Sequence, residues 1–222
     1  MPTANRRPFI RASINMFLAQ TAGACELVIL DDGEEEISDL VFLGHPRIRY
    51  YKEPHRSLGE KHNRLVELAK GDYILHWADD DYHAPWRIKY QVAILESNEA
   101  DLTSCTDILR IDAGAKRAWH EYTDRLSGGC LAYRKEIWNK FKYPDVPHGE
   151  DNGFVDGQIE SGSIAIPSGK YEFHVHRIHA NNSYMQKKAI VEPSSEAPFE
   201  DVKAVIEPYF DEYFGGSDGL PK

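Results

Sequence analysis

Three groups of acidic residues in this chain have the spacing to bind a cation or to move a proton. One group, 31–32, follows the apolar run 26–30, and a second, 79–81, follows the apolar run 72–77. Three adjacent carboxylates repel one another unless a cation or hydrogen-bond donors compensate them. Oxygen ligands suit Mg²⁺ or Mn²⁺, and a divalent ion beside them can neutralise a diphosphate leaving group. The alternative for either group is a turn or a helix cap, which Asp commonly forms.

The third acidic pair, Glu150 and Asp151, lies in a segment rich in Pro and Gly that we expect to be a loop. A carboxylate held beside an electrophilic carbon can act as a general base, and the alternative is a solvated loop. Three histidines, His174, His176 and His179, lie within six residues, and no Cys or acid joins them at the spacing of a structural zinc site. We therefore expect one of them to join a carboxylate-bound metal.

The acidic groups follow elements that alternate between strand and helix. Continuous apolar runs predict buried strands, and apolar residues at helical spacing predict helices. The predicted strands are 26–30, 47–52, 72–77 and 101–109, and the predicted helices are 9–20, 58–69 and 86–97. This order predicts an α/β domain with a mostly parallel central sheet, in which ligands bind at the carboxyl ends of the strands.

The regular alternation of predicted strands and helices ends before residue 114. We expect a short helix at 134–140, strand-like segments across 161–176, a linker rich in Pro, Ser and Glu at 191–198, and a C-terminal helix at 199–214. Trp119, just upstream of a Gly pair, could stack on a sugar or an acceptor, and its alternative place is the core.

The composition is that of a globular protein. The 222 residues suit one domain with a tail, and 36 acidic against 26 basic residues give a net charge of −10. This charge works against nonspecific nucleic-acid binding. We see no apolar run long enough to span a bilayer and no secretion signal, and the three cysteines suggest no disulfide framework. We expect a cytoplasmic protein.

Seven short motifs resemble, in their order along the chain, those of the family 2 glycosyltransferases, which have the GT-A fold. They span residues 2–184. Each motif is weak alone, but seven in order on suitable elements are specific. The motifs are Pro2-Thr3-Ala4-Asn5-Arg6, Leu30-Asp31-Asp32-Gly33, Gly59-Glu60-Lys61-His62-Asn63 with 69–74, Ala78-Asp79-Asp80-Asp81 with Pro85, Gly128-Gly129, Gly149-Glu150-Asp151 and His179-Ala180-Asn181-Asn182-Ser183.

The resemblance implies an inverting transfer of a sugar from a nucleotide sugar, with a UDP-sugar favoured, to an acceptor hydroxyl. It implies a GT-A domain over 1–190, with a nucleotide-sugar half at 1–110 and an acceptor half at 111–190, before a C-terminal linker and helix at 191–222. It also implies Mn²⁺ or Mg²⁺ as cofactor. The acceptor stays open between a glycan, a small molecule, a protein and a hydroxymethylated DNA base, of which the net charge disfavours the last.

The resemblance also assigns roles to single residues. Asp151, beside Glu150, would be the general base. The metal would be held by Asp81 with Asp79 and His179, while Gly128, Gly129 and, by the stacking argument, Trp119 would border the acceptor. The nucleotide sugar would be bound by Pro2, Thr3, Asn5, Arg6, Asp31, Asp32, Lys61, Asp79 and Asp80.

Three positions depart from the family pattern. Ala78 stands where the first acid of the aspartate motif is usual, and His62 stands where an Arg is usual. The family's first strand precedes the opening motif, whereas Met1 directly precedes Pro2 here. Either that strand is absent or the chain starts at an internal Met, and we favour a truncated start.

Two other functions compete with sugar transfer. A nucleotidyltransferase also uses paired carboxylates and a metal, but it needs a Gly-rich basic phosphate loop, and residues 2–8 contain no glycine. A non-catalytic nucleotide-sugar or glycan binder of the same fold is the third hypothesis. The presence of Asp81, Asp151 and His179 argues against this hypothesis, because a protein that only binds would not need them.

Overall fold

The computed structural model describes residues 1–41, 44–54, 56–180, 182 and 193–210. The strands are β1 Pro2–Thr3, β2 Leu27–Asp31, β3 Ile48–Lys52, β4 Tyr73–Leu75, β5 Tyr82–His83, β6 Leu102–Ser104, β7 Asp107–Asp112, β8 Arg117–Tyr122, β9 Ala132–Arg134, β10 Ala165–Pro167, β11 His174–Ile178 and β12 Ser195–Ala197. The helices are α1 Arg7–Leu18, α2 Leu58–Leu68, α3 Arg87–Ser97, α4 Glu150–Glu160 and α5 Phe199–Ile206, with the short 3-10 helices η1 Gly128–Cys130 and η2 Lys135–Asn139.

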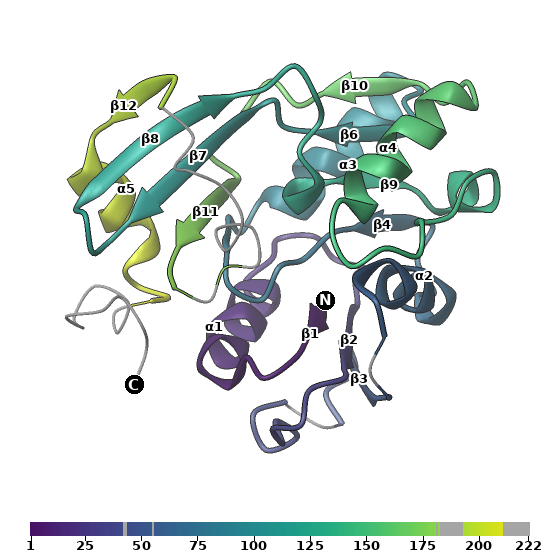
Figure 1. The fold of residues 1–222 in the computed structure, drawn as a ribbon, viewed down its shortest axis with the longest axis horizontal. Helices are drawn as coiled ribbons and strands as arrows, with labels where there is room; N and C mark the ends of the chain where they lie inside the picture. The colour runs from purple at the N-terminus through teal and green to yellow at the C-terminus, as the bar shows by residue number, and fades with distance from the viewer. Residues whose placement is uncertain (42–43, 55, 181, 183–192, 211–222) are drawn as a thin grey trace.

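The described strands form three sheets (Figure 1). The first is parallel and has the order β1-β2-β3. The second has the order β10-β6-β9-β4, in which β10 runs parallel to β6 and β9 runs antiparallel to both of its neighbours. The third has the order β12-β8-β7-β11-β5, with one parallel pair, β11 and β7. The α/β class expected from the sequence is confirmed, with parallel pairing at the N-terminus and mixed pairing elsewhere.

The best-predicted elements have strong local signals. All five residues of β2 are buried, as its continuous apolar run predicts. Helix α2 begins with a capping box, in which the Ser57 hydroxyl accepts from the Glu60 N–H and the Glu60 carboxylate accepts from the Ser57 N–H. Pro8 stands in the first turn of α1, where a missing N–H is tolerated. These local rules place the elements within about two residues of their predicted ends.

Four segments differ from the sequence expectations. The strand expected at 101–109 is two strands, β6 and β7, because the chain passes from the second sheet to the third between them. The helix expected at 134–140 is the end of β9 followed by η2, since β9 pairs with both β4 and β6. The linker expected at 191–198 contains β12, which pairs with β8. Helix α5 ends at Ile206, and residues 211–214 of the expected helix lie outside the described residues.

The expected loop around the third acidic pair is also wrong. Glu150 and Asp151 form the first turn of α4, where negative charge is favourable beside the N–H groups at a helix start. Gly149 precedes the helix with φ of 80°, a left-handed conformation that suits glycine. The helix was missed because Gly153 and Gly157 weaken its propensity.

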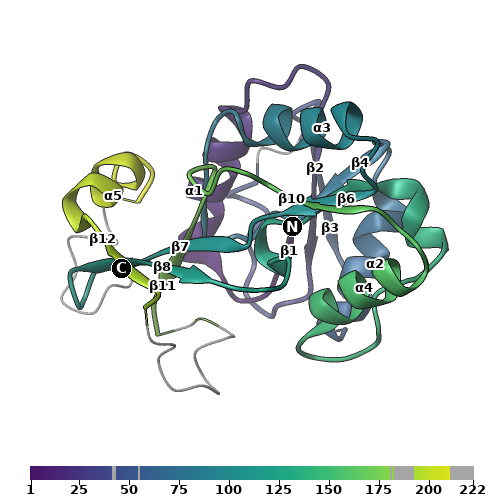
Figure 2. The same ribbon diagram turned by 90° about the horizontal axis from the view of Figure 1, so that it is seen from above.

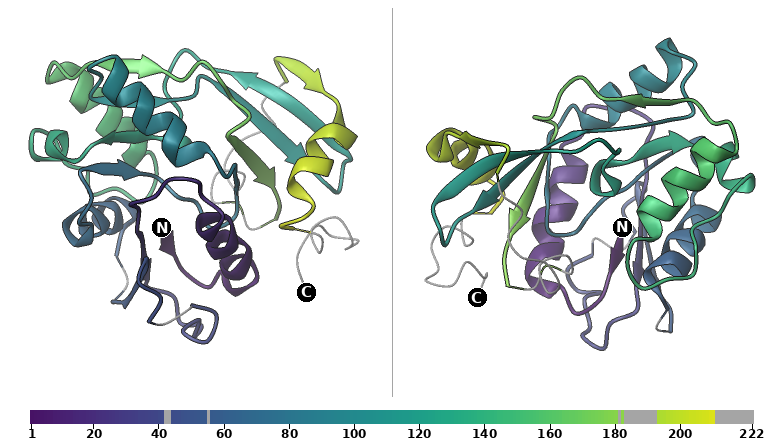
Figure 3. Two further views of the ribbon diagram at one scale, coloured as in Figure 1. Left: turned by 180° about the vertical axis from the view of Figure 1, so that it is seen from behind. Right: turned by 45° about the horizontal axis from the view of Figure 1, so that its top comes forward.

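Helices cover the strands on two sides. Figure 2 shows α3 on one side of the strands and α2 with α4 on the other. The hairpin of β7 and β8 extends away from this part toward α5, which packs against both strands (Figure 3). None of the helices in the described part of the chain has the length and apolar character needed to cross a membrane.

The structure joins Cys105 to Cys130 in a disulfide, which the sequence did not suggest. The two residues are 25 positions apart in the chain, but the end of β6 and η1 bring their Cα atoms to 6.7 Å. That separation falls within the range that a disulfide spans. Pairing of distant segments, which spacing alone does not encode, explains the missed bond.

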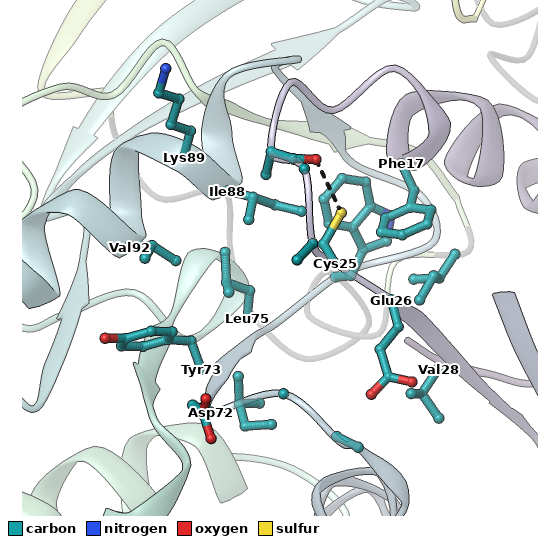
Figure 4. Close-up of a pocket in the computed structure, with 18 of the residues that line it drawn as sticks. Phe17, Cys25, Glu26, Val28, Asp72, Tyr73, Leu75, Ile88, Lys89 and Val92 are labelled. Carbon is teal, nitrogen blue, oxygen red and sulfur yellow. Dashed lines mark hydrogen bonds between the residues drawn. The ribbon is translucent and has the colours of Figure 1, made fainter. Parts of the chain in front are cut away.

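A cavity of about 830 Å³ separates the first sheet from the second (Figure 4). It lies between the edges of β2 and β4, with Leu65 of α2 and Val92 of α3 among its lining residues. His76 and Asp72 form their main-chain hydrogen bonds on the β9 side, so the alternate residues of β4 turn their N–H and C=O groups toward the cavity. No described strand lies between the two edges.

Met1 borders the same cavity. Its ammonium donates to the Val28 carbonyl at 2.8 Å, and the Leu30 N–H donates to the Met1 carbonyl at 3.0 Å. Burial lowers the pKa of this α-amino group to about 5, although the negative charge of Asp79 opposes the shift. A charged ammonium is therefore unfavourable here.

A strand supplied ahead of Met1 should stabilise the fold. Five apolar β-branched residues added there would pair with β2 and β4, bury side chains between α2 and α3, and replace the buried ammonium by an amide. We expect a gain of about 1–3 kcal/mol in the free energy of unfolding, or about 3–10 °C in Tm, after the entropy of ordering is subtracted.

Thermal unfolding of the chain with and without the five added apolar residues measures this effect. An extension of five Gly and Ser residues is the matched control, since it offers the same main chain without apolar side chains. Equal Tm values for the apolar and the Gly/Ser extensions would show that the cavity does not accept a strand.

Candidate active site

A cleft of about 550 Å³ lies where β1, the segment after β4, η1 and the start of α4 meet. The β7–β8 hairpin and β11 close its other side. The cleft thus has strand residues of the first and third sheets in its lining, and it lies beyond the carboxyl ends of β1 and β4, as expected for an open α/β sheet. The residues predicted from sequence that line it are Pro2, Thr3, Arg6, Lys61, Asp79, Asp80, Asp81, Gly128, Gly129 and Asp151.

Asp79 is a buried carboxylate with incomplete compensation. It accepts one hydrogen bond from the Thr3 hydroxyl at 2.6 Å. Burial and then the negative charge of Asp80 raise its pKa to about 7, against the opposing effects of Arg6 and Thr3. The site therefore holds negative charge at an unfavourable position, which a bound cation would relieve.

Asp80 is compensated from both ends of the chain. Its carboxylate forms an ion pair with Arg6 at 2.6 Å and lies 3.2 Å from His179 Nε2. Its main-chain carbonyl also accepts from the Arg177 guanidinium. Burial alone would raise the pKa of Asp80, but the contacts with His179 and Arg6 hold it below the ordinary value.

Asp81 is held by residues of β11. Its carboxylate lies 3.0 Å from His174 Nε2 and 3.2 Å from His176 Nδ1, and it accepts from the Arg177 N–H at 3.1 Å. Burial would raise the pKa of Asp81, but His176 and His174 hold it well below its usual range. Among the described residues, His174 Nδ1 and His176 Nε2 are buried without a hydrogen-bond partner.

A buried arginine fixes the chain beneath the aspartates. Arg87 is fully buried and contacts His83 Nδ1 at 2.6 Å, and it donates to the His76 carbonyl at 2.7 Å. His83 Nε2 lies 3.0 Å from the Ala78 carbonyl. Burial lowers the pKa of Arg87 to about 9 although Asp81 opposes the shift. The segment 76–78 before the aspartates is thereby held by the side chains of Arg87 and His83, in addition to the hydrogen bond from the His76 N–H to the Leu131 carbonyl.

Asp31 and Asp32, at the end of β2, form part of the wall beside the cleft. Asp32 accepts from Lys61 Nζ at 2.5 Å, and Lys61 itself lines the cleft. Asp31 accepts from Lys52 Nζ at 2.8 Å and from the Tyr50 hydroxyl at 2.9 Å. Neither aspartate is among the lining residues. Asp32 thus positions Lys61, and Asp31 stabilises the turn at Gly33 by accepting from its N–H.

Asn5 also stabilises the wall beside the cleft. Its side-chain carbonyl accepts from the N–H groups of Glu34 and Glu35 at 2.8 and 2.9 Å. A Cβ on Gly33 would lie 2.4 Å from the Asn5 main-chain nitrogen, so only glycine permits this approach. Asn5 joins the chain start to the loop after β2 and does not line the cleft.

Asp151 packs against the main chain of η1. A Cβ on Gly128 would lie 1.7 Å from Asp151 Oδ2, so the absence of a side chain at 128 makes room for this carboxylate. Burial raises the pKa of Asp151, while hydrogen bonds from the N–H groups of Asn152 and Asp151 and the charge of Arg125 oppose the shift. A raised pKa brings a carboxylate closer to the range useful for a general base at neutral pH.

Glu150 turns away from the cleft. Its carboxylate lies 3.7 Å from His62 Nε2, and burial followed by the charge of Asp151 raises its pKa to about 7. Burial keeps the pKa of His62 well below its ordinary value, so this histidine is neutral. His62 stacks on His76 with ring centroids 4.4 Å apart.

Trp119 does not reach the cleft. It lies on β8 with 6% of its surface exposed, and the Arg117 guanidinium lies over its ring. His179 lies behind Asp80, where its ring stacks on Phe9 at 4.7 Å. The predicted residues that the structure keeps out of the cleft lining are Asn5, Asp31, Asp32, Trp119, Glu150 and His179.

Sequence reasoning did not predict the contacts of several residues of the site. His174 and His176 were noticed as a cluster, but their contact with Asp81 depends on the pairing of β11 with β5 and β7. Arg110 and Arg125 line the cleft from the hairpin side, paired with Glu121 and Asp156. No local pattern marks these arginines, since their position depends on the hairpin register.

One further group of ligand-type side chains lies close by. Cys105, Cys130 and His174 place a ligand atom each within 4.8 Å of the others in the described part of the chain. The cysteines are joined in a disulfide, so their sulfurs are not free thiolates for a metal. Carboxylates and imidazoles of the cleft are the better donors for a hard divalent ion.

Relatives with curated names point to one activity. An uncharacterised glycosyltransferase of Rickettsia typhi is 27% identical over 96 residues, which is 43% of this chain and 30% of that protein. The uncharacterised glycosyltransferase EpsJ of Bacillus subtilis is 28% identical over 109 residues, 47% of this chain and 32% of that protein. Chondroitin synthase of Escherichia coli is 29% identical over 89 residues, 38% of this chain and 13% of that protein. The chain thus spans about a third or less of these relatives.

Solved structures share the fold over nearly the whole chain. A mannosyltransferase of Pyrobaculum calidifontis, in complex with GDP-Man and Mn²⁺, matches with a TM-score of 0.67 at 16% identity and covers 94% of this chain and 68% of that chain. S. aureus TarS in complex with UDP-GlcNAc matches with a TM-score of 0.68 at 14% identity, covering 97% and 65%. The likeness to these two structures shows the GT-A fold. The family model of glycosyl transferase family 2 matches residues 1–153, and the chain belongs to this family.

Proposed function

We propose that this glycosyltransferase is metal-dependent and inverting, and that it moves a sugar from a nucleotide sugar, with a UDP-sugar favoured, to an acceptor hydroxyl. The observation that carries the proposal is that Asp151 and the three aspartates 79–81 line one cleft. Inversion in a single displacement needs a base on one side of the sugar and a stabilised leaving group on the other. The cleft offers carboxylates for both tasks.

Asp151 is the proposed base. Its buried carboxylate, with a raised pKa, would take the proton of the acceptor hydroxyl as the oxygen attacks the anomeric carbon. Gly128 and Gly129 line the cleft beside it; Gly128 makes room for the carboxylate itself, and Gly129 would leave space for an acceptor. Glu150 sits behind, against His62, and would tune the charge near Asp151 rather than touch substrate.

The aspartate side of the cleft fits a divalent cation. Asp79 carries charge that its surroundings do not compensate, and His176 has a buried Nε2 without a partner among the described residues. Asp81 and Asp79 would hold Mn²⁺ or Mg²⁺, with a histidine of the 174–179 segment. Sequence resemblance assigns that role to His179, and His174 and His176 contact Asp81 directly. Such an ion would neutralise the departing diphosphate.

The donor would lie along the N-terminal wall. Pro2, Thr3, Arg6 and Lys61 line the cleft there, and the two cations are positioned by Asp80 and Asp32. A diphosphate placed near them would accept charge-assisted hydrogen bonds. On the opposite side the hairpin presents polar residues, which fits a polar acceptor bearing a hydroxyl group.

Replacement of Asp151 by Asn tests the proposal. Wild-type protein with Mn²⁺ should release a nucleoside diphosphate from a UDP-, GDP- or TDP-sugar. Asp151→Asn should bind the donor normally and lose transfer by about 10²–10⁴-fold, because the amide takes no proton. The wild-type rate should rise with pH through the raised pKa of Asp151, since only the carboxylate form is active.

Glu160→Gln is the matched control, because Glu160 is an exposed carboxylate of the same helix. It should transfer at the wild-type rate. Release of no nucleoside diphosphate from any of the donors by the wild type, or full activity of Asp151→Asn, would contradict the proposal.

Asp81→Asn should weaken donor binding only when the metal is present. Calorimetric titration of the donor with and without Mn²⁺ measures this, and we expect a loss of about tenfold or more in the metal-dependent affinity. Asp72→Asn, at an acidic position away from the cleft, is the control. Unchanged donor affinity with Mn²⁺ would remove Asp81 from the metal site.

The two glycines of η1 should respond differently to the same substitution. Gly128→Ala puts a methyl group into the space of the Asp151 carboxylate, and overpacking of this kind lowers stability by about 1–3 kcal/mol. Gly129→Ala meets its nearest atom at 3.7 Å, an ordinary contact, and should leave the free energy of unfolding unchanged. Urea unfolding compares the two variants, and equal losses of stability would mean that the approach of Asp151 is unimportant.

A further inference from the structure

A buried histidine contacts the far side of the peptide that Asp151 packs against. His76 follows β4 and is 8% exposed. Its Nδ1 lies 2.7 Å from the Gly128 carbonyl oxygen, and its Nε2 lies 2.6 Å from the Tyr143 hydroxyl. His76 does not line the cleft. Its two ring nitrogens therefore serve the protein rather than a ligand.

The partners of His76 fix its protonation state. A carbonyl oxygen only accepts, so Nδ1 carries the proton and donates to Gly128. Burial lowers the pKa of His76 to about 3, although the Gly128 carbonyl opposes the shift, so the ring is neutral. Nε2 must then accept from the Tyr143 hydroxyl at 2.6 Å, and the oxygen of this hydroxyl also lies 3.1 Å from the Tyr133 hydroxyl. The ring is thus held in one tautomer by a contact at each end.

Tyr143 ties this histidine to two helices. Asn63 of α2 donates to the Tyr143 carbonyl at 2.8 Å and accepts from the Tyr143 N–H at 3.0 Å. The Tyr143 ring stacks on Phe154 of α4, with centroids 4.1 Å apart and planes within 10°. Phe154 lies three residues after Asp151 on the same helix. One rigid group therefore holds both the Gly128 peptide and the start of α4.

Gly128 and the carboxylate of Asp151 are closely packed. An added Cβ would overlap Asp151 Oδ2 at 1.7 Å, so the glycine backbone lies directly against the carboxylate. Rotation of the Gly128 peptide would move the surface on which Asp151 rests. A displacement of about 1 Å at a reacting group can lower a rate by about 10²-fold.

We propose that His76 is a positioning residue, which fixes the Gly128 peptide and thereby the carboxylate of Asp151 in the cleft. The inference rests on the proposed function in one respect, the role of Asp151 as base. The placement of the carboxylate itself does not depend on that role. Other groups that act on Asp151 are Glu150 beside it, Arg125 from the hairpin side and Tyr143 below.

Two substitutions of His76 separate positioning from packing. In His76→Asn the side-chain amide NH₂ takes the place of Nδ1–H and can still donate to the Gly128 carbonyl. His76→Phe keeps a flat ring but donates nothing. We expect His76→Phe to lower kcat by about 10–100-fold with the donor KM within about twofold, and His76→Asn to stay within about threefold of wild type.

A readout independent of activity is the NMR titration of the Asp151 carboxyl carbon, assigned with Asp151→Asn. In wild type and in His76→Asn the pKa should lie above the ordinary range, because the group is buried against Gly128. In His76→Phe it should fall toward the ordinary value as water reaches the loosened carboxylate. Tyr143→Phe, which keeps the stacking and removes the hydroxyl, should lower kcat by about 3–10-fold.

The outcomes are distinguishable. An Asp151 titration that is unchanged in both His76→Phe and Tyr143→Phe overturns the positioning role, whatever the transfer rates are. Loss of rate in His76→Asn equal to that in His76→Phe also overturns it, because a donor at Nδ1 would then be irrelevant. If the wild type transfers no sugar but the titration responds as expected, His76 positions Asp151 and the proposed function fails. If His76→Phe does not fold, Tyr143→Phe and His76→Asn decide by the same titration.

Discussion

The burial of three consecutive carboxylates at 79–81 is the constraint on which the molecule depends. Like charges at adjacent positions are tolerated inside a protein only where other groups compensate each of them. The compensating groups come from opposite ends of the chain, with Thr3 and Arg6 on one side and the segment 174–179 on the other. The fold must therefore bring its N-terminal strand and β11 to one point. Of these three aspartates, Asp79 is the one whose pKa is raised, to about 7, because it is buried and its negative charge is incompletely compensated.

The same requirement explains the mixture of sheets. Strand β11 pairs with β5, which follows the aspartates directly, and with β7 of the hairpin. This pairing brings His174 and His176 to Asp81 and places the hairpin across the cleft from the N-terminal wall formed by Pro2, Thr3, Arg6 and Lys61. The opposite carboxylate, Asp151, reaches the cleft by a different device, a helix that starts after Gly149 and presses its first turn onto Gly128. Separate elements thus supply the carboxylates on the two sides of the cleft.

The sequence predicted what short-range patterns encode. The buried strand β2 with its terminal Asp31, the capped helix α2 and the motif residues that line the cleft all have local signals, such as apolar runs and turn residues. It missed what depends on pairing across the chain, namely the disulfide at Cys105 and the direct contacts of His174 and His176 with Asp81, and it left Trp119 open between the acceptor and the core, where it lies. Asp31 was expected at the ligand, yet it anchors a turn, because a motif gives the order of residues and not the direction of a side chain.

The cavity between β2 and β4 also has a consequence for cooperativity. Strands in one sheet share a ladder of hydrogen bonds and tend to open together, whereas segments joined only by side chains open separately. Among the described residues no strand bridges these two edges, so the unit of β1–β3 meets the rest of the protein through helix packing and through ion pairs at the aspartates. Amide hydrogen exchange would therefore divide the molecule into two protection classes, with the boundary at the edge of β4. Pro2 and Thr3 of the N-terminal wall belong to one class, and Asp151 belongs to the other.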